Sequence, residues 1–153
     1  MLILYRMNIK KNSKYRQGVF TPTNSDKFVG SHAIYRSGLE LKFMRFCDNN
    51  PNIIKWGSEN VVIPYISPVD GRAHRYFVDN FVVIREGSKI GKYLIEIKPF
   101  KQTFAPTTKY KKREHLIYEQ SMYIVNQAKW AAAREYCNRK GLEFLILTEK
   151  DFK

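Results

Sequence analysis

Apolar side chains recur every three or four positions over residues 39–47, and this spacing predicts an amphipathic helix. Ser37 is suited to the N-cap, and Glu40 lies three positions after it, which fits a capping box. Because the residue before a proline avoids the helical conformation, Pro51 predicts that the helix ends at about residue 48.

Three stretches after this helix have the composition of β-strands. The apolar run at residues 61–65 is predicted to be the first strand. Residues 74–84 are largely apolar on both faces, as expected of a central strand that is covered on two sides. Residues 85–88 fit a hairpin turn, and residues 92–98 a third strand that returns beside the second.

A long helix and a last strand complete the pattern. Residues 115–139 have a mixed but helical pattern, and Gly141 is a typical residue just after a helix. Residues 143–147 are predicted to form the final strand. The order helix, three strands, helix, strand indicates an α/β fold in which helices flank a mixed central sheet.

The first part of the chain lacks such periodicity. Residues 1–30 are basic and rich in Ser, Thr, Asn, Gly and Pro, so we expect a basic N-terminal arm, ordered on the domain body or on DNA. Phe20 and Phe28 are candidates for holding the arm to that body. Residues 31–153 are predicted to form one domain, in keeping with a chain of 153 residues.

Composition narrows the class of protein. Hydrophobic residues make up 44% of the chain and aromatic residues 14%, which argues against disorder. Cys47 and Cys137 are far apart and form no CxxC pattern, so we expect reduced core thiols in a cytosolic protein. No apolar run approaches the roughly 20 residues of a membrane span, and residues 1–5 are too short for a signal sequence.

The net charge of +13 favours a polyanionic partner, with nucleic acid the first choice and an acidic membrane the second. A protein that is merely basic and soluble is the alternative. Many of the basic residues follow the third predicted strand, between residues 98 and 113. A basic run of this kind is either a solvated face or a loop that contacts phosphates. We predict DNA contacts for the side chains of Lys101, Lys109, Lys111, Lys112 and Arg113.

Candidate chemistry lies on the second and third strands. Side chains alternate along a strand, so Glu96 and Lys98 point to one face while Ile95 and Ile97 point into a core. Asp79 lies in a mostly buried strand, where an unpaired carboxylate is costly and requires a cationic partner. Two carboxylates can hold a hard divalent cation, and a lysine beside them can orient a water against a phosphate. A buried salt-bridge network in a binding protein is the alternative.

A third carboxylate, that of Glu40, lies at the edge of the apolar stripe of the predicted first helix. It shares a helical face with Met44 and Cys47, which places it close to the buried side. Glu40 therefore either completes a capping box, or belongs to the candidate site, or does both.

These residues together resemble the PD-(D/E)XK nuclease superfamily, whose restriction-endonuclease-like fold has the element order αβββαβ. Glu40 stands on the first helix, Asp79 in the second strand, and Glu96 with Lys98 in the third; Glu96 lies 17 positions beyond Asp79. A valine precedes Asp79 where the motif's name has proline. The chain is also similar, more distantly, to the amino-terminal nuclease domain of Tn7-type transposases. The resemblance to head completion nucleases of contractile-tailed bacteriophages is narrower and is carried by residues 35–43, 50–56, 61–65 and 74–79.

The resemblance implies a metal-dependent DNA endonuclease that acts in phage head completion after DNA packaging. Its Mg²⁺, or Mn²⁺ as a substitute, would be held by Asp79, Glu96 and the Ile97 carbonyl, with Glu40 binding through water or at a second ion. Lys98 would position the attacking water or stabilise the pentavalent phosphate. The implied partners are DNA and phage head or neck proteins, without a membrane, in the host cytoplasm or the virion. A catalytically silent basic module of a virion or DNA-packaging assembly is the alternative.

Overall fold

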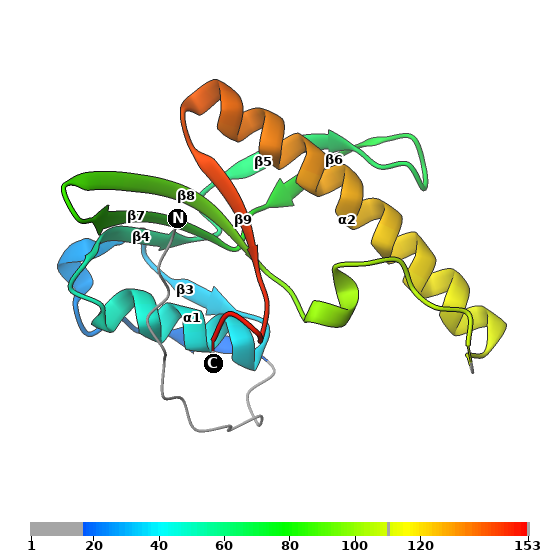
Figure 1. Cartoon of the computed structure of the whole chain (residues 1–153), viewed down its shortest axis with the longest axis horizontal. Coiled ribbons are helices and arrows are strands. Elements are labelled where there is room, and N and C mark those ends of the chain that lie inside the picture. Colours follow the sequence, from blue (N-terminus) through cyan, green and yellow to red (C-terminus); the bar gives the residue numbers. More distant parts are fainter. Residues whose placement is uncertain (1–16, 110, 153) are drawn as a thin grey trace.

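A five-stranded mixed sheet forms the centre of this computed structural model, which describes residues 17–109 and 111–152 (Figure 1). In spatial order its strands are β2 (Phe28–Val29), β4 (Ile53–Ser58), β7 (Asn80–Glu86), β8 (Lys89–Ile97) and β9 (Glu143–Leu147). The central strand β7 is antiparallel to both of its neighbours, β4 and β8, whereas β2 runs parallel to β4 and β9 parallel to β8. The predicted mixed sheet is therefore confirmed.

Two helices cover opposite faces of this sheet, α1 (Gly38–Asn49) and α2 (Arg113–Lys140) (Figure 1). Residues of α1 pack with Tyr93 and Ile95 of β8 in one core. Residues from the C-terminal half of α2 pack with Leu94 of β8 in a second core. Successive side chains of β8 thus enter the two cores in turn, as strand geometry requires. The predicted α/β fold with helices flanking the sheet is confirmed.

Two small antiparallel ribbons and two short 3-10 helices accompany the sheet in the described part of the chain. The ribbons are β1 (Gly18–Phe20) with β3 (Ala33–Tyr35), and β5 (Val62–Ile66) with β6 (Ala73–Phe77). The 3-10 helices are η1 (Ser25–Lys27) and η2 (Phe100–Gln102). The β5–β6 ribbon is inserted between β4 and β7, and it packs beneath α2 through the second core.

The described end of the predicted N-terminal arm lies on the domain body. The ring centroids of Phe20 and Phe28 lie 6.1 Å and 4.7 Å from that of buried Trp56. The backbone N–H groups of Thr23 and Asn24 each donate to a carboxylate oxygen of Asp48 at 2.9 Å. Residues 1–16 lie outside the described residues, and the division of the chain at residue 30 stays a prediction.

The first strand of the sheet differs from the predicted one. The apolar run at residues 61–65 does form a strand, but that strand is β5, which pairs with β6 outside the five-stranded sheet. The strand that lies beside β7 in the main sheet is β4 instead, and its buried Trp56 belongs to the same core as the buried residues of α1. Between the two strands Glu59 adopts φ 54°, and this turn directs the chain out of the main sheet.

The second strand also differs, because the single strand predicted over residues 74–84 is divided. Its first part, β6, pairs with β5, and its second part, β7, pairs with β4 and β8. Val78 and Asp79 join the two parts, and the Val78 N–H donates to the Val61 carbonyl at 3.0 Å. Apolar composition correctly indicates both parts, but composition does not show where a strand changes its partners.

Several local predictions are confirmed. The Ser37 hydroxyl oxygen accepts a hydrogen bond from the Glu40 N–H at 3.1 Å, so Ser37 caps α1. The hairpin turn lies at Gly87 and Ser88, and the last strand has the predicted bounds. Both thiols are free and buried, as expected of reduced core cysteines.

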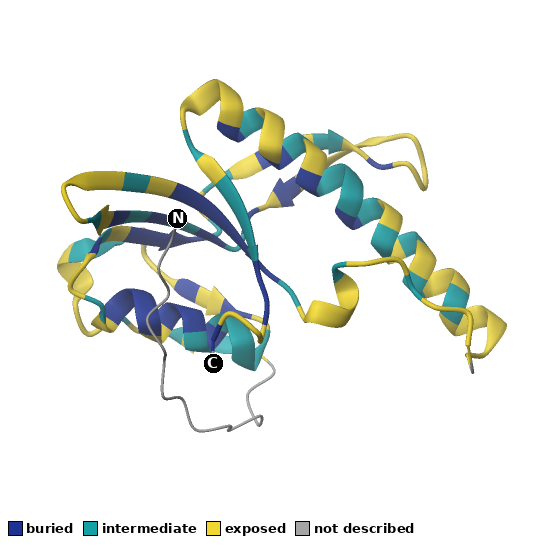
Figure 2. Ribbon diagram, in the orientation of Figure 1, coloured by how far each residue is buried: buried dark blue, intermediate teal, exposed yellow. Residues whose placement is uncertain are grey.

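Burial is uneven along α2. Figure 2 shows buried positions in the sheet, in α1 and in the C-terminal half of α2, while the N-terminal half of α2 is mainly exposed or intermediate. The buried residues of α2 begin at Asn126 and continue to Cys137. No helix in the described ranges is both long enough and apolar enough to cross a membrane.

Gly141 ends α2 in the left-handed conformation, with φ 67°, and its N–H donates to the Cys137 carbonyl. A methyl group at this position would meet no atom within 4 Å, so an alanine there would be strained by its backbone alone. We expect Gly141→Ala to lower the free energy of unfolding by about 1–2 kcal/mol, measured by denaturant titration. Lys140→Ala should change it by no more than about 0.5 kcal/mol. Equal stability of the glycine variant and the wild type would contradict this helix end.

Candidate active site

Asp79 lies where the chain passes from β6 to β7. Its Oδ2 accepts a hydrogen bond from the Ile97 N–H at 2.8 Å, and its carbonyl accepts one from the Glu59 N–H at 3.1 Å. The N–H and C=O of one strand residue point to the same side, so the Ile97 carbonyl faces the edge where Asp79 lies. The Lys98 N–H points to the other side and donates to Leu147 of β9 at 2.9 Å. The end of β8 is thereby held from both sides.

Glu96 is buried beside this edge, with 4% of its surface exposed. The Tyr76 hydroxyl donates to Glu96 Oε2 at 2.5 Å, and Lys98 Nζ lies 3.2 Å from Glu96 Oε1. Glu96 and Lys98 therefore share one side of β8, as strand alternation predicts. Glu96 and Lys98 stand one residue before and one residue after Ile97, whose N–H holds Asp79.

Glu40 reaches the same region from the first turn of α1. Its Oε1 accepts a hydrogen bond from the Ser37 hydroxyl at 3.0 Å, and its Oε2 accepts one from the Arg36 N–H at 2.8 Å. With the bond from the Glu40 N–H to the Ser37 hydroxyl they form a variant of the predicted capping box, in which the Glu40 carboxylate accepts from the Arg36 N–H in place of the Ser37 N–H. Burial raises the pKa of Glu40, the two hydrogen bonds lower it, and the charge of Glu96 raises it further while that of Lys98 lowers it. Glu40 thus takes part in capping α1, and its pKa also responds to the charges of Glu96 and Lys98.

Crowded negative charge is the main electrostatic feature here. Burial raises the pKa of Asp79 well above its ordinary value, and the charges of Glu96 and Glu40 raise it further. The Ile97 N–H and the Lys98 ammonium oppose this shift. A divalent cation beside Asp79 and Glu96 would relieve the repulsion, since it would offset both negative charges.

The donor atoms suit a hard cation. Among residues 17–109 and 111–152, no three His, Cys, Asp or Glu side chains form a ready metal-binding group. The Asp79 carboxylate is turned to the Ile97 amide, and that of Glu96 to Tyr76 and Lys98. Mg²⁺ usually takes only one or two carboxylates and keeps several waters, so Asp79 and Glu96 could hold it without a third carboxylate. The Ile97 carbonyl would add an oxygen from the same edge.

Comparisons with known proteins identify the family. The sequence model of the family described as TnsA-like endonuclease N terminal matches residues 50–149. The chain is also 39% identical over 140 residues to the head completion nuclease of Enterobacteria phage T4, covering 86% of this chain and 90% of that protein. The chain belongs to the TnsA-like endonuclease family. The predicted resemblance and the predicted class of activity, a DNA endonuclease, are confirmed by these relationships.

The region matched by the TnsA-like endonucleases contains Asp79, Glu96 and Lys98, whereas Glu40 precedes it. In the structure Asp79 is bound to the Ile97 amide and Lys98 lies beside Glu96, while the charges of Glu96 and Glu40 act on Asp79 and those of Glu96 and Lys98 act on Glu40. The assignment of individual roles to these residues, including the Ile97 carbonyl as a ligand, stays a prediction.

Two further side chains of this endonuclease belong to the site and were not predicted. A continuous strand would put Tyr76 on the face opposite Asp79, but the strand break brings its hydroxyl to Glu96. Lys129 of α2 lies over the rings of Tyr76 and Tyr65, at 5.6 Å and 5.8 Å from their centroids. Burial lowers the pKa of Lys129 most and the charge of Lys98 lowers it further, while the charges of Glu96 and Asp79 raise it, so Lys129 interacts electrostatically with the site. The signal in the sequence is a single lysine within an otherwise apolar run, residues 128–133.

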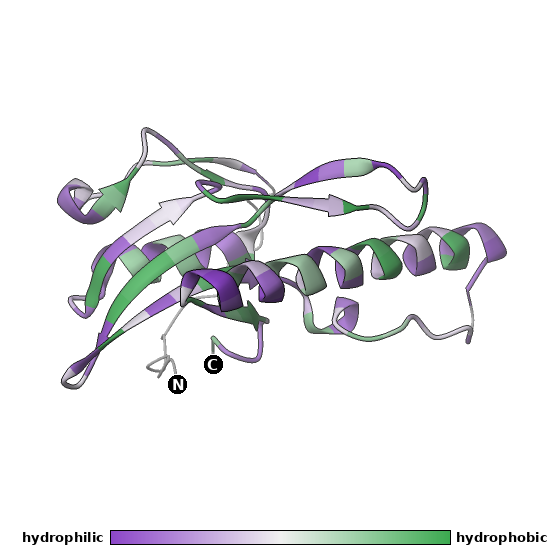
Figure 3. Ribbon diagram, turned by 90° about the horizontal axis from the view of Figure 1, so that it is seen from above, coloured by the Kyte–Doolittle hydropathy of each residue, from purple (hydrophilic) through white to green (hydrophobic). Residues whose placement is uncertain are grey.

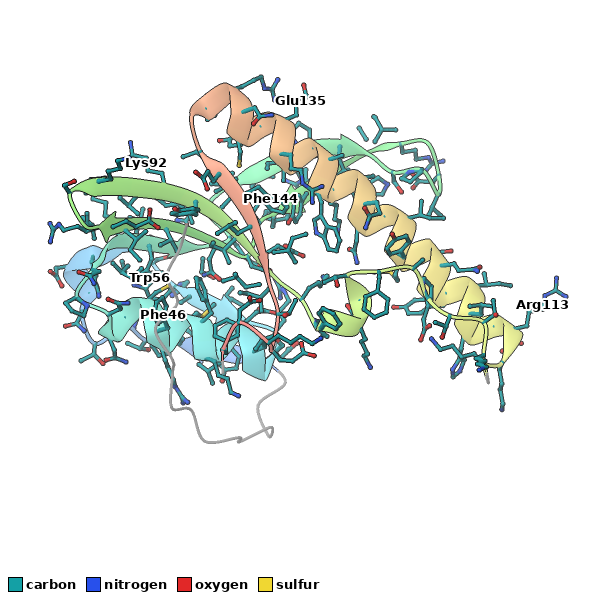
Figure 4. All side chains as sticks on the ribbon, in the orientation of Figure 1. Phe46, Trp56, Lys92, Arg113, Glu135 and Phe144 are labelled. Atoms are coloured by element: carbon teal, nitrogen blue, oxygen red, sulfur yellow. The ribbon has the colours of Figure 1, made fainter. Side chains whose placement is uncertain are left out.

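The residues predicted to contact DNA are all exposed in this structure. Lys101 lies in η2, close to the end of β8, whereas Arg113 begins α2 at its outer end, away from the sheet (Figure 4). The Lys111 ammonium forms an ion pair with the Glu119 carboxylate. The basic run thus leads away from the carboxylates along the loop, and its contact with DNA stays a prediction.

The raised pKa of Asp79 predicts how stability depends on pH. Between the unfolded pKa of about 3.9 and the higher folded value, the folded state binds the proton more tightly, so stability falls as pH rises. In EDTA we expect the free energy of unfolding to fall less steeply above about pH 4 for Asp79→Asn than for the wild type. The amide keeps an acceptor for the Ile97 N–H.

Denaturant titrations from acid to neutral pH measure this difference. Asp70 is a control in which the expected change of stability with pH is reversed, because hydrogen bonds from the Arg72 N–H and His74 lower its pKa. Asp70→Asn should therefore lose stability relative to the wild type as pH rises. Parallel pH profiles for Asp79→Asn and the wild type would show that Asp79 is not under repulsion.

Proposed function

We propose that this endonuclease cleaves DNA with Mg²⁺ held by Asp79, Glu96 and the Ile97 carbonyl, and that Mn²⁺ can replace Mg²⁺. The observation that supports this most is the hydrogen bond from the Ile97 N–H to Asp79, because it fixes one carboxylate beside the strand that carries Glu96 and Lys98. When bound, Mg²⁺ would neutralise phosphate charge and acidify a coordinated water.

The protein's own groups divide the remaining work. The Tyr76 hydroxyl fixes one oxygen of Glu96, so that carboxylate keeps a single orientation. Lys98 lies at the other oxygen and is only partly exposed, which suits it to orient a water or to stabilise charge developing on the phosphate. Lys129 approaches from α2 and supplies a second cation for the same phosphate. Glu40 would bind through water or at a second ion.

We further propose that the chain acts in phage head completion, on a DNA end after packaging. The support is the similarity to the head completion nuclease of phage T4 over most of both chains. Phage head or neck proteins would then be its partners, in the host cytoplasm or the virion. The basic side chains after β8 would contact the DNA backbone.

Cleavage of linear and supercoiled DNA by the purified protein tests this function. We expect cleavage with Mg²⁺ or Mn²⁺ and none with EDTA, and no cleavage by Asp79→Ala or Glu96→Ala variants that remain folded. Cleavage that continues in EDTA would contradict the metal dependence. Binding without cleavage under every metal condition would favour a catalytically silent DNA-binding module instead.

Lys98→Ala separates catalysis from binding. The change leaves both carboxylates in place, so DNA affinity should fall only modestly, because one phosphate interaction is a small part of a +13 surface. The single-turnover cleavage rate should fall about 10²–10³-fold. If Lys98 were only the salt-bridge partner of Glu96, the variant would instead lose up to about 3–5 kcal/mol of stability without a specific effect on rate. Thermal melts beside the rate measurement distinguish the two outcomes.

Neutralising the basic run tests the DNA path. We expect a variant with Gln in place of Lys109, Lys111, Lys112 and Arg113 to bind DNA more weakly at low salt. The slope of log affinity against log salt should become shallower by up to about 0.9 for each phosphate that the protein no longer neutralises. Replacing Lys89 and Lys92, at the hairpin on the far side of the sheet, is the control. An unchanged slope for the fourfold variant would place the DNA elsewhere.

A further inference from the structure

A groove of about 720 Å³ lies between the loop after β8 and the N-terminal half of α2. Lys101 and Phe104 line it from the loop, and His115, Tyr118 and Tyr123 line it from the helix. Figure 4 shows the two segments facing each other, with rings between them. Both walls begin beside the candidate site, the loop just after Lys98 and the helix wall within one turn of Lys129.

One stripe of side chains runs along the whole of α2. His115, Glu119, Met122 and Asn126 line the groove, and Ala133 continues the same helical spacing into the second core. The inner half of the stripe is covered by β5, β6 and β9, whereas the helix has no buried residue before Asn126. Figure 3 shows hydrophilic and hydrophobic positions mixed along the outer half, and the stripe itself carries His115 and Glu119 there beside Met122. Most helical stability in proteins comes from tertiary packing, so this uncovered and mixed outer half is open to a ligand that offers both polar and stacking groups.

The lining combines rings with positive charge. Phe104 is 46% exposed and Tyr118 is 67% exposed, on opposite walls of the groove. The ammonium groups of Lys101 and Lys111 also line it, and Glu119, the paired carboxylate of Lys111, is the acidic residue there. Aromatic platforms for bases beside cations for phosphates are the features by which proteins bind single-stranded nucleic acid.

A buried polar atom at the inner end supports the same ligand. Asn126 is 3% exposed and lines the groove, and its side-chain Oδ1 has no hydrogen-bond partner among the described residues. An unsatisfied buried acceptor is costly, and the amino group of an unpaired base would satisfy it. A base that is paired and stacked inside a duplex would first have to leave the stack to reach this atom.

We propose that this groove binds an unpaired segment of the DNA substrate and leads it to the carboxylates. The inference rests on the proposed function, and it names the substrate class as DNA with a single-stranded end or flap beside a duplex. From His115 to Asn126 the helix wall rises about 16 Å, at 1.5 Å per residue. That length fits about four or five stacked nucleotides at 3.4 Å each.

Fluorescence anisotropy in EDTA tests the proposal without cleavage. The probes are a duplex that carries a single-stranded tail longer than the groove and a blunt duplex of the same paired sequence. Phe104→Ala and Tyr118→Ala remove exposed rings, so the fold should persist. Each should bind the tailed duplex about 5- to 100-fold more weakly and the blunt duplex as the wild type does. Tyr118→Phe keeps the ring and should bind the tailed duplex like the wild type.

Ile117→Ala is the matched control, because Ile117 is exposed on the opposite face of the same helix turn and does not line the groove. Its affinity for both probes should equal that of the wild type. Three results would overturn the proposal: equal losses for tailed and blunt DNA, no loss in either ring variant, or a wild type that sediments as a dimer while the ring variants sediment as monomers, because the groove would then be covered by a second copy of the chain. Failure of the nuclease assignment would appear separately, as intact tailed binding without cleavage under any metal condition.

Discussion

The hydrogen bond between the Ile97 amide and the Asp79 carboxylate is the contact on which the site depends. Asp79 lies between the β5–β6 ribbon and the five-stranded sheet, and at this position the chain is not paired with a neighbouring strand by regular backbone hydrogen bonds. By accepting from the end of β8, it takes the place of a ladder partner and is fixed beside Glu96 and Lys98. The site thus lies where a strand is interrupted. Glu40 of α1 and Lys129 of α2, the helices on the two faces of the sheet, interact with its charges.

The arrangement carries an electrostatic cost that a cation would remove. Burial and mutual repulsion raise the pKa of Asp79, while Lys98 and Lys129 offset part of the negative charge. Stability is lost where groups are held for chemistry rather than for folding, and such sites commonly show shifted pKa values. Glu40 takes part in the capping of α1 with Ser37, so its proposed role at the site would make one carboxylate serve both folding and chemistry.

Local signals in the sequence predicted much of this structure. The capping box of α1, the alternation that puts Glu96 and Lys98 on one face, and the end of α2 at Gly141 each depend on a few neighbouring residues. The exchange of strand roles between β4 and β5, and the break at Asp79, depend on pairing between segments far apart in the chain. Neither the alternation of side chains between the two faces of a strand nor apolar composition shows which strands pair. Lys129 was missed for the same reason, since only the packing of α2 brings it to the carboxylates.

The central claim is that the strand break brings Asp79 and the end of β8 together to bind a divalent cation. Crystals soaked in Mn²⁺ and measured at the manganese absorption edge test it directly. The account predicts an anomalous peak within coordination distance of the Asp79 carboxylate, the Glu96 carboxylate and the Ile97 carbonyl, and no peak there in Asp79→Asn crystals. The claim would be contradicted if the wild-type protein cleaved DNA with Mn²⁺ but its anomalous peak lay away from these three groups.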